Sequence, residues 1–474
     1  MTIVTMTART LHRFVSLALC LCVASGCVLG PDYQRPDVVE PAAFRGEGAD
    51  ASAMSIADVQ WSSIATDPVL QDLINTALAN NLDLRIATAR VEEARARYGI
   101  ARSFLLPEVG ASGGYSSEQM SGSADPAESG GSDRSYQNWN AGLQVSWEVD
   151  LFGRVRRQSE AAFAEYLATE QGRRGVLVLL VADVSSTYYF LRQLDLQLEI
   201  AQQTAASNEE TVQFYEKRLR GGISNRLELD TAIANRARTT ALIPDLNVQI
   251  ASAENALSVL LGLPPGPVKR GESVTALQLP ATIPVGLPAQ LLERRPDVME
   301  AEQQLVAANA RVGAAKAAFF PSISLTGLYG GVSGDFSNLL SSDAEVWSVN
   351  PSLFAPIFQG GRLRSNYEAS QAVYQQAFSQ YQNAALNSYR EVANALVAVE
   401  MLGEQRMTLE TGVAALQDSA MLSRLRYNAG LATYLEILNA DQQLLDQRIL
   451  LAKTEGEELR AYVELYRALG GGWQ

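Results

Sequence analysis

Residues 138–149 read Asn138-Trp-Asn-Ala-Gly-Leu-Gln-Val-Ser-Trp-Glu-Val149, and polar and apolar side chains alternate along the whole stretch. A period of two is typical of a β-strand with one polar and one apolar face. The pattern fits a soluble sheet packed on a core, or a membrane barrel whose apolar face meets lipid. Trp139 and Trp147 lie about 27 Å apart along such a strand, close to the ~25 Å lipid band that aromatic residues border. We therefore expect both in a membrane aromatic belt.

The number of such strands limits how a barrel could form. A partner strand near 109–117 and a polar loop predict a first β-hairpin at 109–149. A similar pattern predicts a second at 322–357, with a strand at 322–329, a loop at 330–345 and a strand at 346–356. Pro351 favours an edge or a bend in the last strand. Four strands fall short of the smallest membrane barrels, which have about eight, and an open edge cannot stand in lipid. Several chains must then share one barrel; two copies would supply eight strands and three would supply twelve.

The chain also repeats itself. Gly222-Ile-Ser-Asn-Arg-Leu-Glu-Leu matches Gly430-Leu-Ala-Thr-Tyr-Leu-Glu-Ile, and Asn81-Leu-Asp-Leu-Arg-Ile-Ala matches Arg295-Pro-Asp-Val-Met-Glu-Ala. Self-similarity at a long, fixed spacing indicates two copies of one structural unit. We expect a two-fold internal repeat, with copies at 65–262 and 287–474 joined by a Pro/Gly-rich connector at 263–286.

Long helices are expected in both copies. No proline interrupts the helical spacing from Val155 to Arg220, or from Arg362 to about Arg426. A helix of about 65 residues would be about 98 Å long, which predicts coiled-coil packing rather than a globular core. Each run reaches a glycine turn and returns, so helical hairpins are expected at 155–261 and 361–469, the first bent at Pro244. The turns contain Gly221, Gly222, Asn428 and Gly430, and Gly222 and Gly430 would supply positive φ angles.

The N-terminus predicts export. Arg9 and Arg13 precede an apolar stretch of about 11 residues, which suits a signal peptide at 1–26 and is too short to span a bilayer. Val23-Ala-Ser-Gly-Cys27 resembles the bacterial lipobox, whose cysteine carries lipid as the first mature residue. The resemblance implies lipid attachment at Cys27, a lipidated N-terminal arm at 27–64 and an outer-membrane location.

Composition excludes several classes of function. The chain has one histidine and three cysteines, and all four lie within the first 27 residues. The body therefore lacks the groups for disulfides, for thiolate or imidazole metal sites, and for histidine-based nucleophilic catalysis. A formal net charge of −14 argues against nucleic-acid binding. We expect that the protein is not an enzyme and that it has no catalytic residue, no metal ion and no cofactor other than the lipid.

Further motifs point to a family. These are Gly30-Pro-Asp-Tyr-Gln-Arg-Pro36, Leu292-Glu-Arg-Arg-Pro-Asp-Val298 and Phe319-Phe-Pro-Ser-Ile-Ser-Leu325. With them, essentially the whole mature chain resembles the lipoprotein branch of the OprM and TolC outer-membrane efflux channels. The resemblance implies an α+β membrane protein of a Gram-negative outer membrane: a homotrimer with a 12-stranded β-barrel, four strands per chain, and a long α-helical periplasmic barrel.

The resemblance also implies partners and a role. The channel would be a passive conduit for small molecules, joined by a periplasmic adaptor (membrane fusion protein) to an inner-membrane RND pump. The helical tips would meet the adaptor at Gly221, Gly222, Asn428 and Gly430. The periplasmic gate would lie at Leu435, followed one helical turn later by Asn439, where the family has an aspartate. Gln442 likewise replaces a family arginine.

Two alternatives remain open at this level. One is an outer-membrane channel for type I protein secretion, and the other is a periplasmic coiled-coil scaffold lipoprotein without a pore. The two expected outer loops are acidic, which predicts a cation preference at the channel mouth. The residues concerned are Asp125, Glu128, Asp133, Asp335, Asp343 and Glu345.

Overall fold

The computed structural model of the chain describes residues 28–41, 44, 55, 67–119, 135–271, 273, 286 and 288–471. The predicted signal peptide 1–26 and the predicted lipid site Cys27 lie outside these residues. Three acidic residues of the first outer loop, Asp125, Glu128 and Asp133, also lie outside them.

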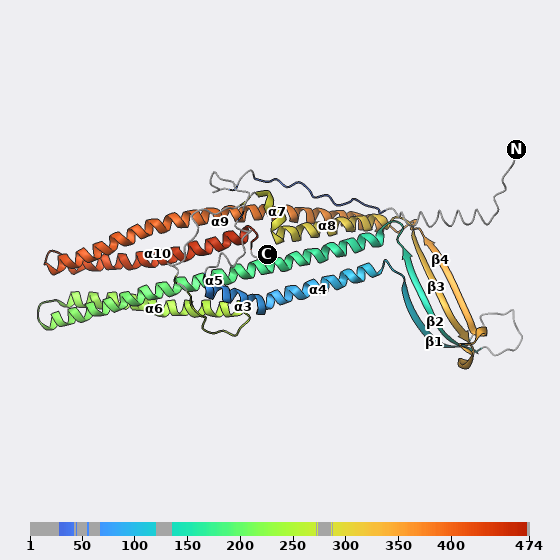
Figure 1. Cartoon of the computed structure of the whole chain (residues 1–474), viewed down its shortest axis with the longest axis horizontal. Coiled ribbons are helices and arrows are strands. Elements are labelled where there is room, and N and C mark those ends of the chain that lie inside the picture. Colours follow the sequence, from blue (N-terminus) through green and yellow to red (C-terminus); the bar gives the residue numbers. More distant parts are fainter. Residues whose placement is uncertain are drawn as a thin grey trace. The chain divides into compact units, whose positions relative to one another are not determined.

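Helices make up most of the described chain (Figure 1). They are α3 (Pro68–Asn80), α4 (Leu82–Ser103), α5 (Arg154–Arg220), α6 (Arg226–Leu260), α7 (Leu291–Arg294), α8 (Pro296–Ala317), α9 (Arg362–Asn428) and α10 (Tyr434–Ala468). The strands are β1 (Glu108–Gln119), β2 (Ser135–Val149), β3 (Ser322–Ser333) and β4 (Glu345–Phe354), and short 3-10 helices lie at Pro288–Gln290, Phe336–Asn338 and Ser342–Ala344.

The long helices come in matched pairs. α5 and α9 each have 67 residues, and α6 and α10 each have 35. These pairs occupy the segments for which the sequence predicts helical hairpins. The helix α6 continues through Pro244, the residue at which a bend was expected.

The chain divides into two compact units. The first contains residues 1–36, 91–168 and 301–380, and the second contains residues 37–90, 169–300 and 381–474. The helices α4, α5, α8 and α9 contribute residues to both units.

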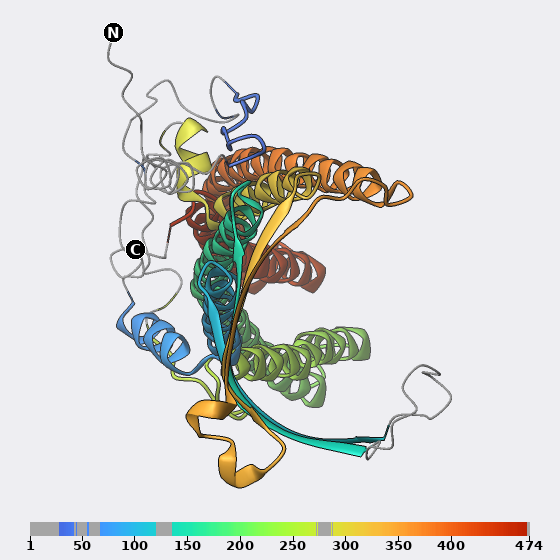
Figure 2. The same cartoon turned by 90° about the vertical axis from the view of Figure 1, so that its right-hand side faces the viewer.

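The first unit contains a four-stranded antiparallel sheet in the order β1-β2-β3-β4. Figure 2 shows the curvature of this sheet. Val145 of β2 pairs with Val109 of β1 and Gly327 of β3, and Gly327 pairs with Val349 of β4. The outer edges of β1 and β4 have no partner strand within this sheet. The strand that contains Pro351 is thus an edge strand, which confirms one of the two options expected for it.

The strand β3 is longer than the sequence predicts. It runs to Ser333, whereas the sequence predicts a strand that ends at Tyr329 and a loop that begins at Gly330. Gly330 and Gly331 instead pair with Gly142 and Ala141 of β2. A Cβ atom on Gly330 would collide with the β2 backbone, so glycine permits the close approach that continues the strand.

An extended arm binds to the first unit through the motif that begins at Gly30. Arg35 donates two hydrogen bonds of 2.7 Å to the Glu302 carboxylate, which also accepts one from the Tyr33 hydroxyl. Asp32 pairs at 2.7 Å with Arg157, whose side chain is only 3% exposed. The motif is therefore a set of anchoring contacts to α5 and α8.

The second unit has a large apolar core. Helices α3, α5, α6 and α10 contribute to it, and among its most buried members are Leu70, Ile74, Val184, Leu191 and Leu257. The start of α3 is fixed by the buried Asp67, which accepts the backbone N–H of Val69 at 2.8 Å and so caps the helix. Tyr188 donates to the same carboxylate at 2.5 Å and ties α5 to this helix start.

The Arg295-Pro296-Asp297 motif also acts in the second unit. The buried Arg295 guanidinium binds the Asp297 carboxylate and, at 2.8 Å, that of Glu391 on α9. It also donates to the backbone oxygen of Ala468 at the end of α10, at 2.9 Å. Carbonyls at a helix C-terminus need such a donor, so this arginine joins three helices.

Only one helix in the described part of the chain, α5, has an 18-residue stretch apolar enough to cross a membrane. Half of that stretch is buried within the protein. Burial of this kind is expected of a core helix, since an apolar helix face must pack against other elements.

Candidate functional site

The two turns at the tips of the helical hairpins have the same geometry. Ile223 N–H donates to Arg218 O and Gly222 N–H to Leu219 O, at 3.0 and 3.1 Å. Leu431 and Gly430 make the same two bonds to Arg426 and Tyr427, both at 2.9 Å. Gly222 and Gly430 have φ angles of +72° and +73°. These are the bonds of a Schellman motif, which ends a helix with a left-handed residue.

An arginine supports each tip turn. Arg218 donates to Ile223 O at 3.2 Å, and Arg426 donates to Leu431 O at 3.3 Å. Each arginine therefore bonds across its own turn through both its backbone and its side chain. Sequence reasoning missed this role, although each arginine lies four residues before a matched glycine, and an alignment of the two tip segments could have found both.

The tips of the two hairpins share one small apolar cluster. It contains Val212, Tyr215, Leu229 and Ala232 of the first hairpin and Tyr434 and Ile437 of the second. The rings of Tyr215 and Tyr434 lie 4.6 Å apart between centroids. Burial raises the pKa of Tyr434 to about 12, and the negative charge of Asp441 adds to the effect.

The predicted gate residues lie on the exposed side of α10. Leu435 is 59% exposed, and Asn439 is exposed one turn later. The neighbours Ile437 and Leu438 are buried, so the two faces of the helix are distinct. The four predicted tip residues Gly221, Gly222, Asn428 and Gly430 are exposed as well. The sequence-predicted residues are thus on the surface of the single chain, where a second molecule can contact them.

The acidic residue that follows the predicted gate residues pairs with another helix. Asp441 pairs with Arg424 of α9 at 3.0 Å. Burial raises the pKa of the Asp441 carboxyl, and the nearby Arg424 opposes that shift. Asp441 is thus directed toward Arg424 of α9, whereas Leu435 lies on the exposed side of α10.

A ladder of neutral side chains joins the two hairpins close to the predicted gate residues in the sequence of α10. Gln442 of α10 donates to Asn235 of α6 at 3.3 Å, and Asn235 donates to Asn208 of α5 at 3.1 Å. Asn208 donates in turn to the Thr239 hydroxyl at 3.0 Å. Asn208, Asn235 and Thr239 are at most 8% exposed. Sequence reasoning missed this ladder; the signal was a polar residue at each of these positions inside helices expected to form coiled coils.

The sheet has one apolar and one polar face, as the alternation in residues 138–149 predicts. Directly paired residues point to the same side, which places Val109, Leu143, Tyr329, Trp347 and Val349 on the apolar side, all at least 52% exposed. The opposite side is mostly polar, although Leu328, Val332 and Val346 also lie on it; its polar residues include Gln144, Ser146, Ser324, Thr326, Ser348 and Asn350. The apolar side is thus a broad exposed surface, of the kind found at membrane contacts.

The two predicted belt tryptophans lie near opposite ends of β2 on the apolar side. Trp139 packs against Tyr115 and Phe336, with centroid distances of 4.6 and 5.0 Å. Trp147 donates its indole N–H to the backbone oxygen of Leu105 at 3.2 Å. A tryptophan with an apolar body and a satisfied N–H suits a membrane interface.

Acidic side chains of the second outer loop are accessible. Asp335, Asp343 and Glu345 are exposed. Within the described residues, no group of three or more His, Cys, Asp or Glu side chains is arranged to hold a metal ion.

Comparisons with known proteins match this architecture. The family profile described as "Outer membrane efflux protein" matches residues 73–263 and 287–471. The cation efflux system protein CusC of Escherichia coli O6:H1 is 36% identical over 465 residues, covering 97% of this chain and 98% of the relative. The solvent efflux pump outer membrane protein SrpC of Pseudomonas putida is 35% identical over 470 residues, with 97% and 99% covered.

A solved structure agrees with these relatives. The outer-membrane channel OprN superposes with a TM-score of 0.88 at 30% identity, covering 94% of this chain and 100% of that one. The exposed apolar sheet face, the long helices and these matches lead to one conclusion. The chain belongs to the outer membrane efflux protein family, within the TolC superfamily, and is an outer-membrane channel of an efflux system.

Proposed function

We propose that three copies of the chain form one pore, with a 12-stranded barrel in the outer membrane and a helical tunnel in the periplasm. The observation that carries the proposal is the sheet, which has an exposed apolar face and unpaired edges at β1 and β4. Unpaired backbone groups are too costly in lipid, so the β4 of one chain would pair with the β1 of the next. The number three follows the resemblance to TolC-type channels.

We further propose that the chain is a two-fold repeat. The equal lengths of α5 and α9 and of α6 and α10 support it, as do the matched tip turns at Gly222 and Gly430. The copies are 65–262 and 287–474, with a connector at 263–286. A repeated helical hairpin would let three chains supply six similar hairpins to one tunnel wall.

Lipid attachment at Cys27 is supported by the position of the residues that follow it. Leu29 N–H donates to Phe152 O at 3.2 Å, and Gly153 packs against Val28. Phe152 and Gly153 lie directly after β2, beyond its last residue Val149. A lipid on Cys27 would then begin beside the end of a membrane strand, where acyl chains can enter the inner leaflet. The arm at 27–64 would bind the channel while the lipid adds a second anchor.

The proposed gate and docking roles are supported by the exposure of these residues and by the resemblance to the efflux-channel family. Leu435 would form an apolar constriction, and Asn439 would form a less charged second ring than the aspartate of the family. The tips at Gly221, Gly222, Asn428 and Gly430 would bind a periplasmic adaptor, which links the channel to an inner-membrane RND pump. The channel itself would be passive and catalyse no reaction, since the pump supplies the energy.

The cargo is proposed to be small molecules. CusC is named for cations and SrpC for solvents, so relatives of similar identity serve different chemistries. Such a range is expected when the pump selects the substrate and the channel only conducts it.

Two adjacent residues of β4 test the barrel. Ser348 lies on the polar side of the sheet, and Val349 lies on the apolar side. An arginine on the lipid side of a barrel costs about 2–4 kcal/mol near the bilayer midplane, whereas the lumen side tolerates charge. We expect Val349→Arg to abolish outer-membrane trimers, measured by native mass spectrometry of membrane extracts, and Ser348→Arg to retain them. Equal loss or equal tolerance in the two variants would argue against a lipid-facing apolar side.

A further inference from the structure

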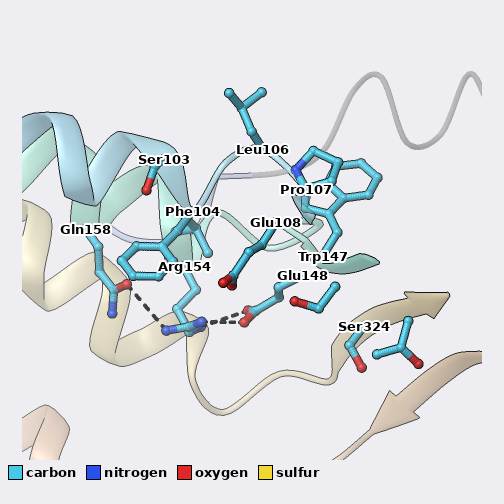
Figure 3. A pocket seen from close by; sticks show the side chains of 13 residues that line it. Ser103, Phe104, Leu106, Pro107, Glu108, Trp147, Glu148, Arg154, Gln158 and Ser324 are labelled. Atoms are coloured by element: carbon cyan, nitrogen blue, oxygen red, sulfur yellow. Dashed lines mark hydrogen bonds and ion pairs between the residues drawn. The ribbon is translucent and has the colours of Figure 1, made fainter. Parts of the chain in front are cut away.

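An open cavity lies at the base of the sheet, within the first unit. Its volume is about 810 Å³, which lies within the range of small-molecule sites. It is formed where α4 leads into β1, where β2 leads into α5, and at the start of β3 (Figure 3). Its lining includes Phe104, Leu106, Glu108, Glu148, Arg154 and Thr326.

The charges in this cavity leave one carboxylate unneutralised. Arg154 binds the Glu148 carboxylate with both Nε and Nη2, at 3.0 and 2.5 Å. Glu108 is exposed, and its carboxylate has no side-chain hydrogen bond or ion pair with any other described residue. Figure 3 shows the Glu108 and Glu148 carboxylates directed toward the same space, with Arg154 bound to Glu148 and to the Gln158 amide oxygen but not to Glu108. The cavity therefore carries one net negative charge.

The other walls of the cavity are apolar or neutral. Phe104 is 62% exposed, and it lines the same cavity as Arg154 and Glu108 (Figure 3). Ser146, Ser324 and Thr326 supply hydroxyl groups from the polar side of the sheet. An aromatic ring and a free carboxylate that line one cavity are a combination that attracts organic cations. A metal ion fits less well, because the described residues offer no group of three suitable ligands.

The surrounding strands favour the same sign of charge. The polar side of the sheet carries Glu108, Glu118 and Glu148, and the four strands contain no lysine or arginine. A wall with charge of one sign raises the local concentration of counter-ions. Glu108 would contribute to this field at the base of the barrel.

We propose that this cavity is a transit site for amphiphilic organic cations, with Glu108 neutralising the positive charge and Phe104 contacting the apolar body. The proposal rests on the proposed function, because it takes the polar side of the sheet as the lumen. It names a substrate class that the channel favours at the entrance to the barrel. In a trimer, three such cavities would surround the pore.

The first test is equilibrium binding to the purified full-length channel in detergent. The probe is tetraphenylphosphonium, and the neutral control is triphenylphosphine oxide. We expect Glu108→Gln to weaken tetraphenylphosphonium binding about fivefold, the upper range for an exposed charge pair, and to leave binding of the oxide unchanged. Phe104→Leu should weaken the cation about threefold through loss of the aromatic face.

Two further variants separate this cavity from the general field of the barrel. Glu118→Gln removes an acid from the same side of β1, near its other end, and should change binding less than twofold. Arg154→Gln frees the Glu148 carboxylate and should tighten cation binding, which a purely structural role would not produce. Equal affinity in wild type and Glu108→Gln would overturn the proposal, as would an equal loss in Glu118→Gln.

Current recordings in planar bilayers test the cation site and the pore separately. If tetraphenylphosphonium blocks the wild-type current and Glu108→Gln relieves the block, both the pore and the site are supported. A normal current with a block that is independent of Glu108 would contradict the proposed site but not the proposed pore. Glu108-dependent binding without any current would contradict the proposed pore but not binding of the cation in the cavity.

Discussion

The side-chain amide of Gln442 on α10 donates a hydrogen bond of 3.3 Å to the side-chain oxygen of Asn235 on α6. Asn235 continues the ladder to Asn208 and Thr239, so Asn235 couples the two helical hairpins near their tips. Arg238 of α6 and Asp446 of α10 add an exposed ion pair between the same helices, at 2.8 Å. The buried part of the connection is uncharged, so salt should affect it little.

Removing the centre of this ladder should destabilise the protein. Asn235→Ala leaves the half-buried donor of Gln442 and the buried acceptor of Asn208 without this partner, which costs about 1–3 kcal/mol. Asn247→Ala, an exposed site on the same helix, should change stability by less than about 0.5 kcal/mol. Denaturant unfolding followed by circular dichroism measures both. Equal stability of Asn235→Ala and wild type would show that the ladder is not stabilising.

The tip glycines provide a second prediction. A Cβ atom on Gly430 would meet open space, so only its φ of +73° opposes a side chain. Gly430→Ala should strain the turn by about 1 kcal/mol and reduce efflux if the adaptor binds this tip. Gly99→Ala, at an exposed helical glycine of α4 that also has open space at its Cβ position but no positive φ, is the control and should leave efflux unchanged. Efflux is measured by dye accumulation in cells that lack their own channel.

A clear result would count against the docking role. If Gly430→Ala trimers assemble normally and support the same efflux as wild type, the tip geometry does not contribute to adaptor binding.

Alkaline pH should loosen the tips through Tyr434. Burial raises its pKa from 10.0 to about 12, so the fold favours the neutral phenol. This stabilisation is complete below pH 10 and is lost as the pH rises through 12. The thermal midpoint of wild type should therefore fall more steeply over this interval than that of Tyr434→Phe. Parallel pH profiles for the two proteins would refute the assignment.

The depth of three tryptophans tests the orientation of the sheet. The row of pairs through Trp347 includes Leu143, midway between Trp139 and Trp147 on β2. In single-tryptophan variants, lipids brominated deep in the acyl chain should quench Trp347 most strongly. Lipids brominated near the headgroup should quench Trp139 and Trp147 most strongly. If Trp347 resists all brominated lipids, the apolar side does not face the bilayer.

Local patterns in the sequence predicted the elements well. The alternation from Asn138 to Val149 predicted the two faces of β2, because side-chain direction in a strand depends only on parity. The glycine pair in β3 was misread, since Gly330 and Gly331 look like loop residues until the close approach of β2 is seen. Local preference alone could not distinguish these cases.

Contacts between distant segments could not be predicted. The bond from Arg35 to Glu302 and the ladder from Gln442 to Asn208 join residues that share no local pattern. The sequence shows that such residues exist, and only the folded chain brings them together. The cavity at Glu108 depends in the same way on three segments that meet at the base of the sheet.

Single-channel recording of the purified protein in planar bilayers tests the central claim most directly. The account predicts discrete pore currents for wild type and a larger conductance for Leu435→Ala, because truncating an exposed leucine would widen an apolar constriction. Leu438→Ala, a buried neighbour on the same helix, should not enlarge the pore. Absence of any current from well-folded protein would contradict the channel, and unchanged conductance in Leu435→Ala would contradict the gate.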